Sequence, residues 1–159
     1  MSDFKRILDG LNGAGVRYVL VGGIALIRHG VVRATRDVDV IIASDLENLV
    51  QVRSLIAAWP ATRPDGSPVP VDMVAPGRTI NLSTPHGDLD LLAERPSPLS
   101  FQELLVRAEV RRVDGSQAPI CSLADLVALK RMAGRERDLL DLRDLEIAHG
   151  ELPDSRTPS

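Results

Sequence analysis

Residues 22–42, GGIALIRHGVVRATRDVDVII, constrain the fold of this chain more than any other stretch. They begin with a glycine pair and end with Asp37 and Asp39 inside an apolar run that is typical of a buried strand. Alternate residues of a strand share one face, so both carboxylates leave the same face. Neighbouring carboxylates repel one another and lose hydration in a closed site, and a cation between them reverses that cost. The stretch therefore predicts a cation site on a strand over residues 37–42.

The rest of the sequence alternates helical and strand patterns, which predicts an α/β (α+β) fold with a mixed β-sheet flanked by helices. We expect one domain over residues 1–150, with a catalytic sheet in about 1–95, a helical C-terminal part in about 99–150, and a disordered tail over 151–159. Helices are expected over 4–13, 24–30, 45–59, 97–108, 122–134 and 135–150, strands over 16–21, 37–42, 71–75, 79–85 and 86–94, a hairpin over 109–120, and a loop over 60–70.

Strand 86–94 supplies further carboxylates. Asp88 and Asp90 share one face of it, while Leu89 and Leu91 take the other. Mg²⁺ prefers oxygen ligands and is usually held by one or two carboxylates together with substrate phosphates. Two such ions stabilise both the attacking and the leaving oxygen of a phosphoryl displacement. We expect Asp90 to be the third carboxylate of such a site, with Asp88 as the second candidate.

The glycine pair has a complementary use. Gly22 and Gly23 follow the strand expected over 16–21 and open a short helix. Glycine allows a sharp turn and a close approach of a ligand to main-chain N–H groups, and a helix N-terminus favours anions. Either motif alone is common in ordinary turns and solvated strands. Their order along the chain indicates that triphosphate oxygens lie between the turn and the acidic strand.

Composition excludes several classes of protein. Aromatic residues make up 3% of the chain, which argues for a core of Leu, Val, Ile and Ala and against a module that stacks bases on aromatic rings. The formal net charge of −3 differs from the basic footprint of a dedicated nucleic-acid binder. One cysteine, Cys121, allows neither an internal disulfide nor a cysteine zinc cluster. The absence of a signal-peptide pattern and of a membrane-length apolar run leads us to expect a cytoplasmic protein without a membrane partner.

The order apolar–Gly–Gly, 13 residues from Ile24 to Arg36, then Asp–apolar–Asp resembles the signature of the DNA polymerase β-like nucleotidyltransferase superfamily. The resemblance covers about residues 16–93. It implies a mixed sheet, two Mg²⁺ ions held by Asp37, Asp39 and Asp90, and transfer of a nucleoside monophosphate from an NTP to a hydroxyl. It also implies that the glycine pair cradles phosphates and that Asp90 helps to deprotonate the acceptor.

The C-terminal stretch SLADLVALKRMAGRERDLLDLRDL is similar to the end of small bacterial AbiE-toxin-type and some aminoglycoside nucleotidyltransferases. In those proteins the lysine-bearing helix faces the nucleotide, which gives Lys130 a catalytic and nucleotide-binding role. Lys130 shares the apolar face of its helix and so needs an anion, either the triphosphate or Asp138 or Asp141 of the next helix. Arg36 is a candidate phosphate ligand, although alternation with Asp37 directs it to the other face. Arg135 and Arg137 are expected to be solvated or to contact the acceptor.

The first functional hypothesis is a Mg²⁺-dependent nucleotidyltransferase, toxin-like, that modifies a tRNA 3′ end or a protein side chain and has a cognate antitoxin as partner. The turn is Gly-Gly and not Gly-Ser. This favours the toxin-like and drug-modifying branches of the superfamily over the minimal antitoxin-like nucleotidyltransferases. The second hypothesis keeps the reaction and takes an aminoglycoside or another small molecule as acceptor. The third is a non-catalytic nucleotide-sensing or antitoxin subunit, against which the three carboxylates argue.

Overall fold

The structure is a computed structural model that describes residues 2–154. Within them the chain forms helices, strands and one short 3-10 helix, η1 (Val71–Met73). The helices are α1 (Phe4–Gly13), α2 (Gly22–Arg28), α3 (Leu46–Ala58), α4 (Phe101–Arg107), α5 (Leu123–Ala133) and α6 (Glu136–His149). The strands are β1 (Tyr18–Val21), β2 (Asp37–Ile42), β3 (Ile80–Thr84), β4 (Gly87–Leu92), β5 (Glu109–Val113) and β6 (Ser116–Ile120).

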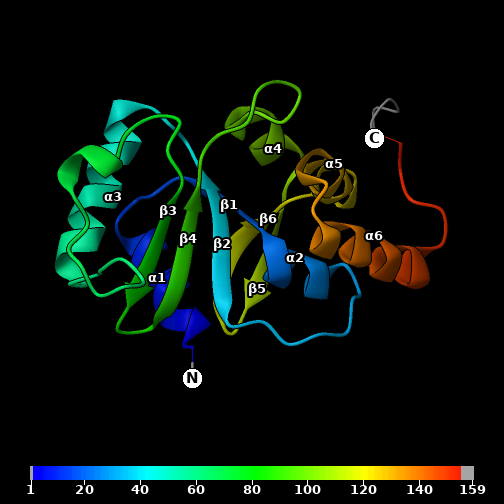
Figure 1. The fold of residues 1–159 in the computed structure, drawn as a ribbon, viewed down its shortest axis with the longest axis horizontal. Coiled ribbons are helices and arrows are strands. Elements are labelled where there is room, and N and C mark those ends of the chain that lie inside the picture. Colours follow the sequence, from blue (N-terminus) through cyan, green and yellow to red (C-terminus); the bar gives the residue numbers. More distant parts are fainter. Residues whose placement is uncertain (1, 155–159) are drawn as a thin grey trace.

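The strands of the described residues form one mixed sheet in the order β3-β4-β2-β1-β6-β5 (Figure 1). The neighbours β1–β2, β3–β4 and β5–β6 are antiparallel, whereas β2–β4 and β1–β6 are parallel. All four residues of β1 are buried, as expected for a central strand covered on both faces. The predicted mixed sheet flanked by helices is confirmed.

The helices leave part of one sheet face open. Helix α1 packs against α3, β4 and β6, and it lies behind the sheet in Figure 1. Helix α2 contacts β1, β2 and α5 on the opposite face. In Figure 1 no helix lies in front of β2, β4 and β3. Polar side chains of these strands therefore have room on that face.

The core is aliphatic, as the scarcity of aromatic residues predicts. Its largest fully buried side chains are all Leu or Ile. Helix α1 supplies Ile7, Leu8 and Leu11 at helical spacing, and Asp3 caps its start by accepting a hydrogen bond from the Arg6 amide. Burying one such side chain stabilises the folded protein by about 1.5–3 kcal/mol, compared with leaving it exposed.

One expectation about the elements was wrong. Residues 71–75 form η1 and a bend, because Pro70 and Pro76 flank them and Thr62 bridges to Ser83 of β3 instead. The expected hairpin over 109–120 is present as β5–β6, and it joins the same sheet through Leu20 and Ile120. The sheet therefore extends beyond residue 95 and includes residues from both parts of the chain.

Residues 151–154, the described part of the expected disordered tail, lie against the rest of the chain. Leu152 is buried against the core, and the Pro153 carbonyl accepts a hydrogen bond from Arg131. Residues 155–159, to which the same expectation applied, lie outside the described residues. Among the described residues, none of the helices combines the length and the apolar character that a membrane crossing requires.

Candidate active site

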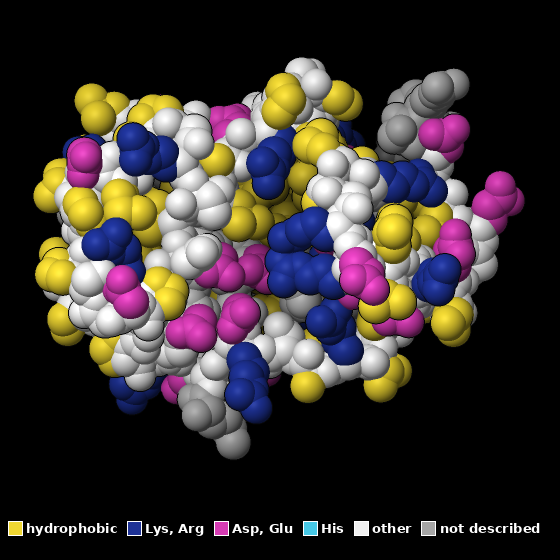
Figure 2. All heavy atoms as spheres, viewed as in Figure 1, with side chains coloured by type: hydrophobic (Ala, Val, Ile, Leu, Met, Phe, Trp, Pro, Cys, Tyr) yellow, Lys and Arg dark blue, Asp and Glu magenta, His cyan; other side chains and the backbone are white. Residues whose placement is uncertain are grey.

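The predicted carboxylates lie on two adjacent parallel strands. Strand β2 carries Asp37 and Asp39, and β4 carries Asp88 and Asp90. The register pairs Asp37 with Asp88 and Asp39 with Asp90, so all four side chains share one face. The alternating residues Val38, Val40, Leu89 and Leu91 are buried on the other face. Figure 2 shows acidic side chains gathered over β2 and β4 on the open face of the sheet.

The four carboxylates repel one another. Desolvation, a hydrogen bond with Asp39 and the charges of Asp39, Asp37 and Asp88 raise the pKa of Asp90 to about 7. Desolvation and the charges of Asp39 and Asp88 also raise the pKa of Asp37, although Arg137 and Arg36 oppose the shift. Asp90, rather than Asp88, is the β4 residue that the register places opposite Asp39. A proton or a cation is needed between them.

The glycine turn lies directly against this cluster. Val21, the last residue of β1, is paired with Asp39, and Gly22 follows it with a φ of 66°. A Cβ added to Gly22 would overlap the Asp39 carboxylate and lie 2.7 Å from its Cβ, and one added to Gly23 would lie 2.5 Å from the Thr35 Oγ1. Only glycine allows the backbone to come so close to these side chains. Helix α2 has only seven residues. We therefore attribute the role of the Gly22–Gly23 turn to the close approach of its backbone to Asp39, and not to the dipole of the helix.

The donor set fits Mg²⁺ in its chemistry. All four groups are carboxylates, the oxygen ligands that Mg²⁺ prefers, and their mutual repulsion is relieved by a cation. No three acidic, histidine or cysteine side chains of residues 2–154 are grouped as ready-made ligands of one ion. Mg²⁺ is usually bound by one or two carboxylates and completed by substrate phosphates. The Asp39–Asp90 pair meets that smaller requirement.

Lys130 is held inside the helical pair α5–α6. Its ammonium lies 2.8 Å from the Asp141 Oδ2 and 3.4 Å from the Asp138 Oδ1, and 13% of its side chain is exposed. Asp141 also binds Arg33, and Asp138 also binds Arg135. Of the two anions expected for Lys130, the aspartates of the next helix are the ones it contacts.

The fully buried Asp138 is ionised in this network. Burial acts to raise the pKa of Asp138, but hydrogen bonds from Arg135 and the charge of Lys130 outweigh it, so the pKa is lowered. The carboxylate accepts hydrogen bonds from the Arg135 Nε and from the Arg135 backbone amide, at 2.7 and 3.1 Å. The start of α6 is therefore fixed by buried ion pairs.

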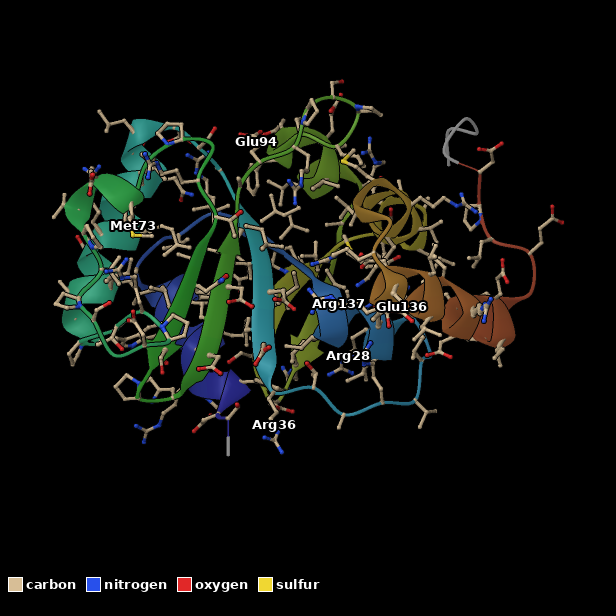
Figure 3. The ribbon with its side chains drawn as sticks, in the orientation of Figure 1. Arg28, Arg36, Met73, Glu94, Glu136 and Arg137 are labelled. Atoms are coloured by element: carbon tan, nitrogen blue, oxygen red, sulfur yellow. The ribbon has the colours of Figure 1, made fainter. Side chains whose placement is uncertain are left out.

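The exposed arginines differ in their relation to the carboxylates. The Arg36 side chain extends away from the sheet at the start of β2, as its alternation with Asp37 indicates (Figure 3). Arg137, at the start of α6, lies beside β2 (Figure 3), and Lys and Arg side chains gather next to the acidic ones in Figure 2. The sequence left Arg137 either solvated or in contact with the acceptor, because nothing in it specifies which strand the start of α6 lies beside.

No protein-family model matches this sequence, and no curated protein matches it. Solved structures do match its fold. A candidate nucleotidyltransferase from Thermotoga maritima has a TM-score of 0.62 at 15% identity, with 88% of each chain covered.

Two proteins with bound small molecules match similarly. The lincomycin-bound lincosamide antibiotic adenylyltransferase LnuA has a TM-score of 0.59 at 15% identity, over 90% of this chain and 94% of that one. ANT(2″)-Ia in complex with adenylyl-2″-tobramycin has a TM-score of 0.58 at 12% identity, over 92% and 87%. The chain therefore has the fold of the nucleotidyltransferases, as the resemblance of its motifs predicts.

Proposed function

We propose that this protein is a Mg²⁺-dependent nucleotidyltransferase that transfers an NMP group from an NTP to an acceptor hydroxyl. The observation that carries the proposal is the pairing of Asp39 with Asp90 on adjacent strands beside the Gly22–Gly23 turn, within a nucleotidyltransferase fold. Asp37, Asp39 and Asp90 would hold two Mg²⁺ ions. Bound there, the ions would neutralise the phosphates and the leaving group.

The residues of the chain have separate tasks in this reaction. The backbone at Gly22 and Gly23 admits the phosphates close to Asp39. The Asp90 carboxylate accepts the proton of the acceptor hydroxyl, as a general base within hydrogen-bond reach of it would. The acceptor oxygen then bonds to the α-phosphorus, the bond from this phosphorus to the β-phosphate breaks, and pyrophosphate leaves. Lys130 acts on the site indirectly, because its ion pairs with Asp138 and Asp141 fix the position of α6.

The first candidate acceptor is a tRNA 3′ end or a protein side chain, which would make the protein the toxin of a pair with an antitoxin. Arg36 supports an RNA acceptor, because it is exposed and begins its course at the start of the acidic strand β2 (Figure 3). Arg28, on α2, is a second exposed arginine of the same part of the chain. Cationic side chains beside an acidic site give an RNA affinity that falls with salt.

The second candidate acceptor is a small hydroxyl compound such as an aminoglycoside. It is favoured by the two antibiotic-bound structures, because this fold covers 94% and 87% of their chains. The carboxylates of the open face would also attract a cationic compound.

A labelling assay tests the reaction and names the acceptor. The protein is incubated with Mg²⁺ and each NTP labelled at the α-phosphate, alone and with total tRNA, with cell lysate, with an aminoglycoside or with a lincosamide. Asp39→Asn is run in parallel, and Asp144→Asn, on the exposed side of α6, serves as the matched control.

Label that enters one acceptor with the native protein and Asp144→Asn, and not with Asp39→Asn, is the expected result. If no mixture is labelled, the catalytic function is excluded. Binding of NTP without transfer would then identify a nucleotide-sensing or antitoxin subunit.

A further inference from the structure

A triphosphate beside four carboxylates requires cations from the protein. The NTP is itself an anion, and Asp37, Asp39, Asp88 and Asp90 line the face on which it would lie. Metal ions offset part of this charge, and Arg or Lys side chains commonly supply the rest by hydrogen bonds to phosphate oxygens. The resemblance gives this task to Lys130.

The contacts of Lys130 are unfavourable for that task. Its ammonium already lies between Asp138 and Asp141, and the side chain is nearly buried. Turning it toward a phosphate would leave each of two buried carboxylates short of a partner, which is strongly unfavourable for buried charges. Arg135 also has a partner already, since its guanidinium donates hydrogen bonds to Asp138 from Nε and from one terminal nitrogen.

Arg137 is an available cation on the α6 side of the cluster. Its side chain is exposed and takes part in no hydrogen bond or ion pair with any residue of the described range 2–154. Its positive charge stabilises the ionised form of Asp37, so it lies within electrostatic reach of the cluster. Figure 3 places it between the start of α6 and β2, on the open side of the sheet.

The backbone that carries Arg137 is fixed. The residues on either side, Glu136 and Asp138, belong to the first turn of α6, and the Asp138 carboxylate caps that turn through the Arg135 amide. Asp138 is in turn held by Lys130. A guanidinium on a fixed backbone loses less freedom on binding, and its planar fork matches two phosphate oxygens.

We propose that Arg137 binds the β- and γ-phosphates of the NTP, the part that leaves as pyrophosphate, while Lys130 is confined to the buried ion pairs of α5 and α6. This inference rests on the proposed function. It gives Arg137 a phosphate-binding role that the motifs of the sequence do not assign to it.

Calorimetric titration of the protein with inorganic pyrophosphate in the presence of Mg²⁺ tests the assignment. The result does not depend on which base the NTP carries or on which acceptor the protein uses. The variants are Arg137→Gln, Arg137→Lys and, as matched control, Arg143→Gln. Arg143 is an exposed arginine further along α6 that forms no ion pair within residues 2–154. AMP is titrated in parallel, and thermal unfolding checks that each variant is folded.

We expect Arg137→Gln to weaken pyrophosphate binding by about ten- to a hundredfold, the range of a charged hydrogen bond, and to leave AMP binding unchanged. Arg137→Lys should retain part of the affinity, and Arg143→Gln all of it. Equal pyrophosphate affinity of Arg137→Gln and the native protein would overturn the inference even where the labelling assay succeeds. A native protein that binds neither pyrophosphate nor any NTP would overturn both this inference and the proposed function.

Discussion

At the scale of single residues, Asp90 couples the stability of the metal-free protein to pH. Its pKa is about 7 in the folded protein, against 3.8 for an unperturbed aspartate. Between these values the folded state keeps a proton that the unfolded state has lost, so the free energy of unfolding falls as pH rises. The fall should end above about pH 7. Its size is roughly 2–4 kcal/mol, from about three pKa units reduced for the partial exposure of the group.

Urea unfolding of the metal-free protein from pH 4 to pH 8 measures this slope. Asp90→Asn removes the titrating group and should flatten the decline, leaving the variant more stable than the native protein at pH 8. Asp144→Asn should keep the native slope. Saturating Mg²⁺ should raise the stability of the native protein above pH 7 and have a smaller effect on Asp90→Asn. A native slope retained by Asp90→Asn would show that repulsion at this carboxylate does not control the decline.

Gly22 is expected to tolerate no side chain. The substitution Gly22→Ala places a Cβ in a left-handed backbone position and against the Asp39 carboxylate. Gly15→Ala is the matched control, because Gly15 has a φ of 71° and no atom within 4 Å of the added Cβ. Both variants carry a backbone cost of about 1 kcal/mol. Only Gly22→Ala should in addition abolish nucleotidyl transfer, which the labelling assay measures. Full transfer by a folded Gly22→Ala protein would contradict a close approach of the phosphates there.

The residues of the site were predictable where one strand or one turn decides their position. The period of two along a strand places Asp37 with Asp39 and Asp88 with Asp90, and the structure adds that Asp39 and Asp90 are neighbours. The partners of Lys130 and the position of Arg137 depend on how α6 packs against α5 and β2. Such packing involves residues far apart in the sequence, so helix periodicity alone left both alternatives for Lys130 open.

At the scale of elements, strands with a clear apolar pattern and glycine or proline limits were predicted well. Strand β2 has the expected limits, and β3, β4 and the β5–β6 hairpin lie within the expected ranges. The stretch at 71–75 has a similar apolar content but no strand beside it to pair with. Pairing across space, which a local pattern does not contain, therefore decides between a strand and a turn.

The α5–α6 helix pair should depend strongly on Lys130. Lys130→Ala leaves Asp138 and Asp141 with one arginine partner each, and we expect a loss of about 2–4 kcal/mol in the free energy of unfolding. The other lysine of the chain, Lys5, pairs with Asp9 at an exposed position, so Lys5→Ala should cost less than about 1 kcal/mol. Urea unfolding at pH 7 measures both values. Equal losses for the two variants would argue against a buried network around Lys130.

At the scale of the whole molecule, the sheet joins the two parts of the chain into one folding unit. Strand β1 lies between β2 from the N-terminal part and β6 from the C-terminal part. The backbone amide of Cys121 donates to the carbonyl of Leu20, which extends that junction. The carboxylates and Arg137 come from the two parts, so the proposed site forms only when both are in place.

This arrangement predicts that residues 1–98 do not fold alone. Without the C-terminal part, β1 loses β6, and the core loses buried side chains that include Ile120, Leu126, Val127 and Leu145. Each contributes about 1.5–3 kcal/mol, and their sum matches the entire stability of 5–15 kcal/mol typical of a domain. A fragment ending at residue 154 keeps these contacts and Leu152, and it should unfold like the full chain. Far-ultraviolet circular dichroism with urea titration compares the two fragments. A cooperative unfolding transition of residues 1–98 would show that the N-terminal part is a domain of its own.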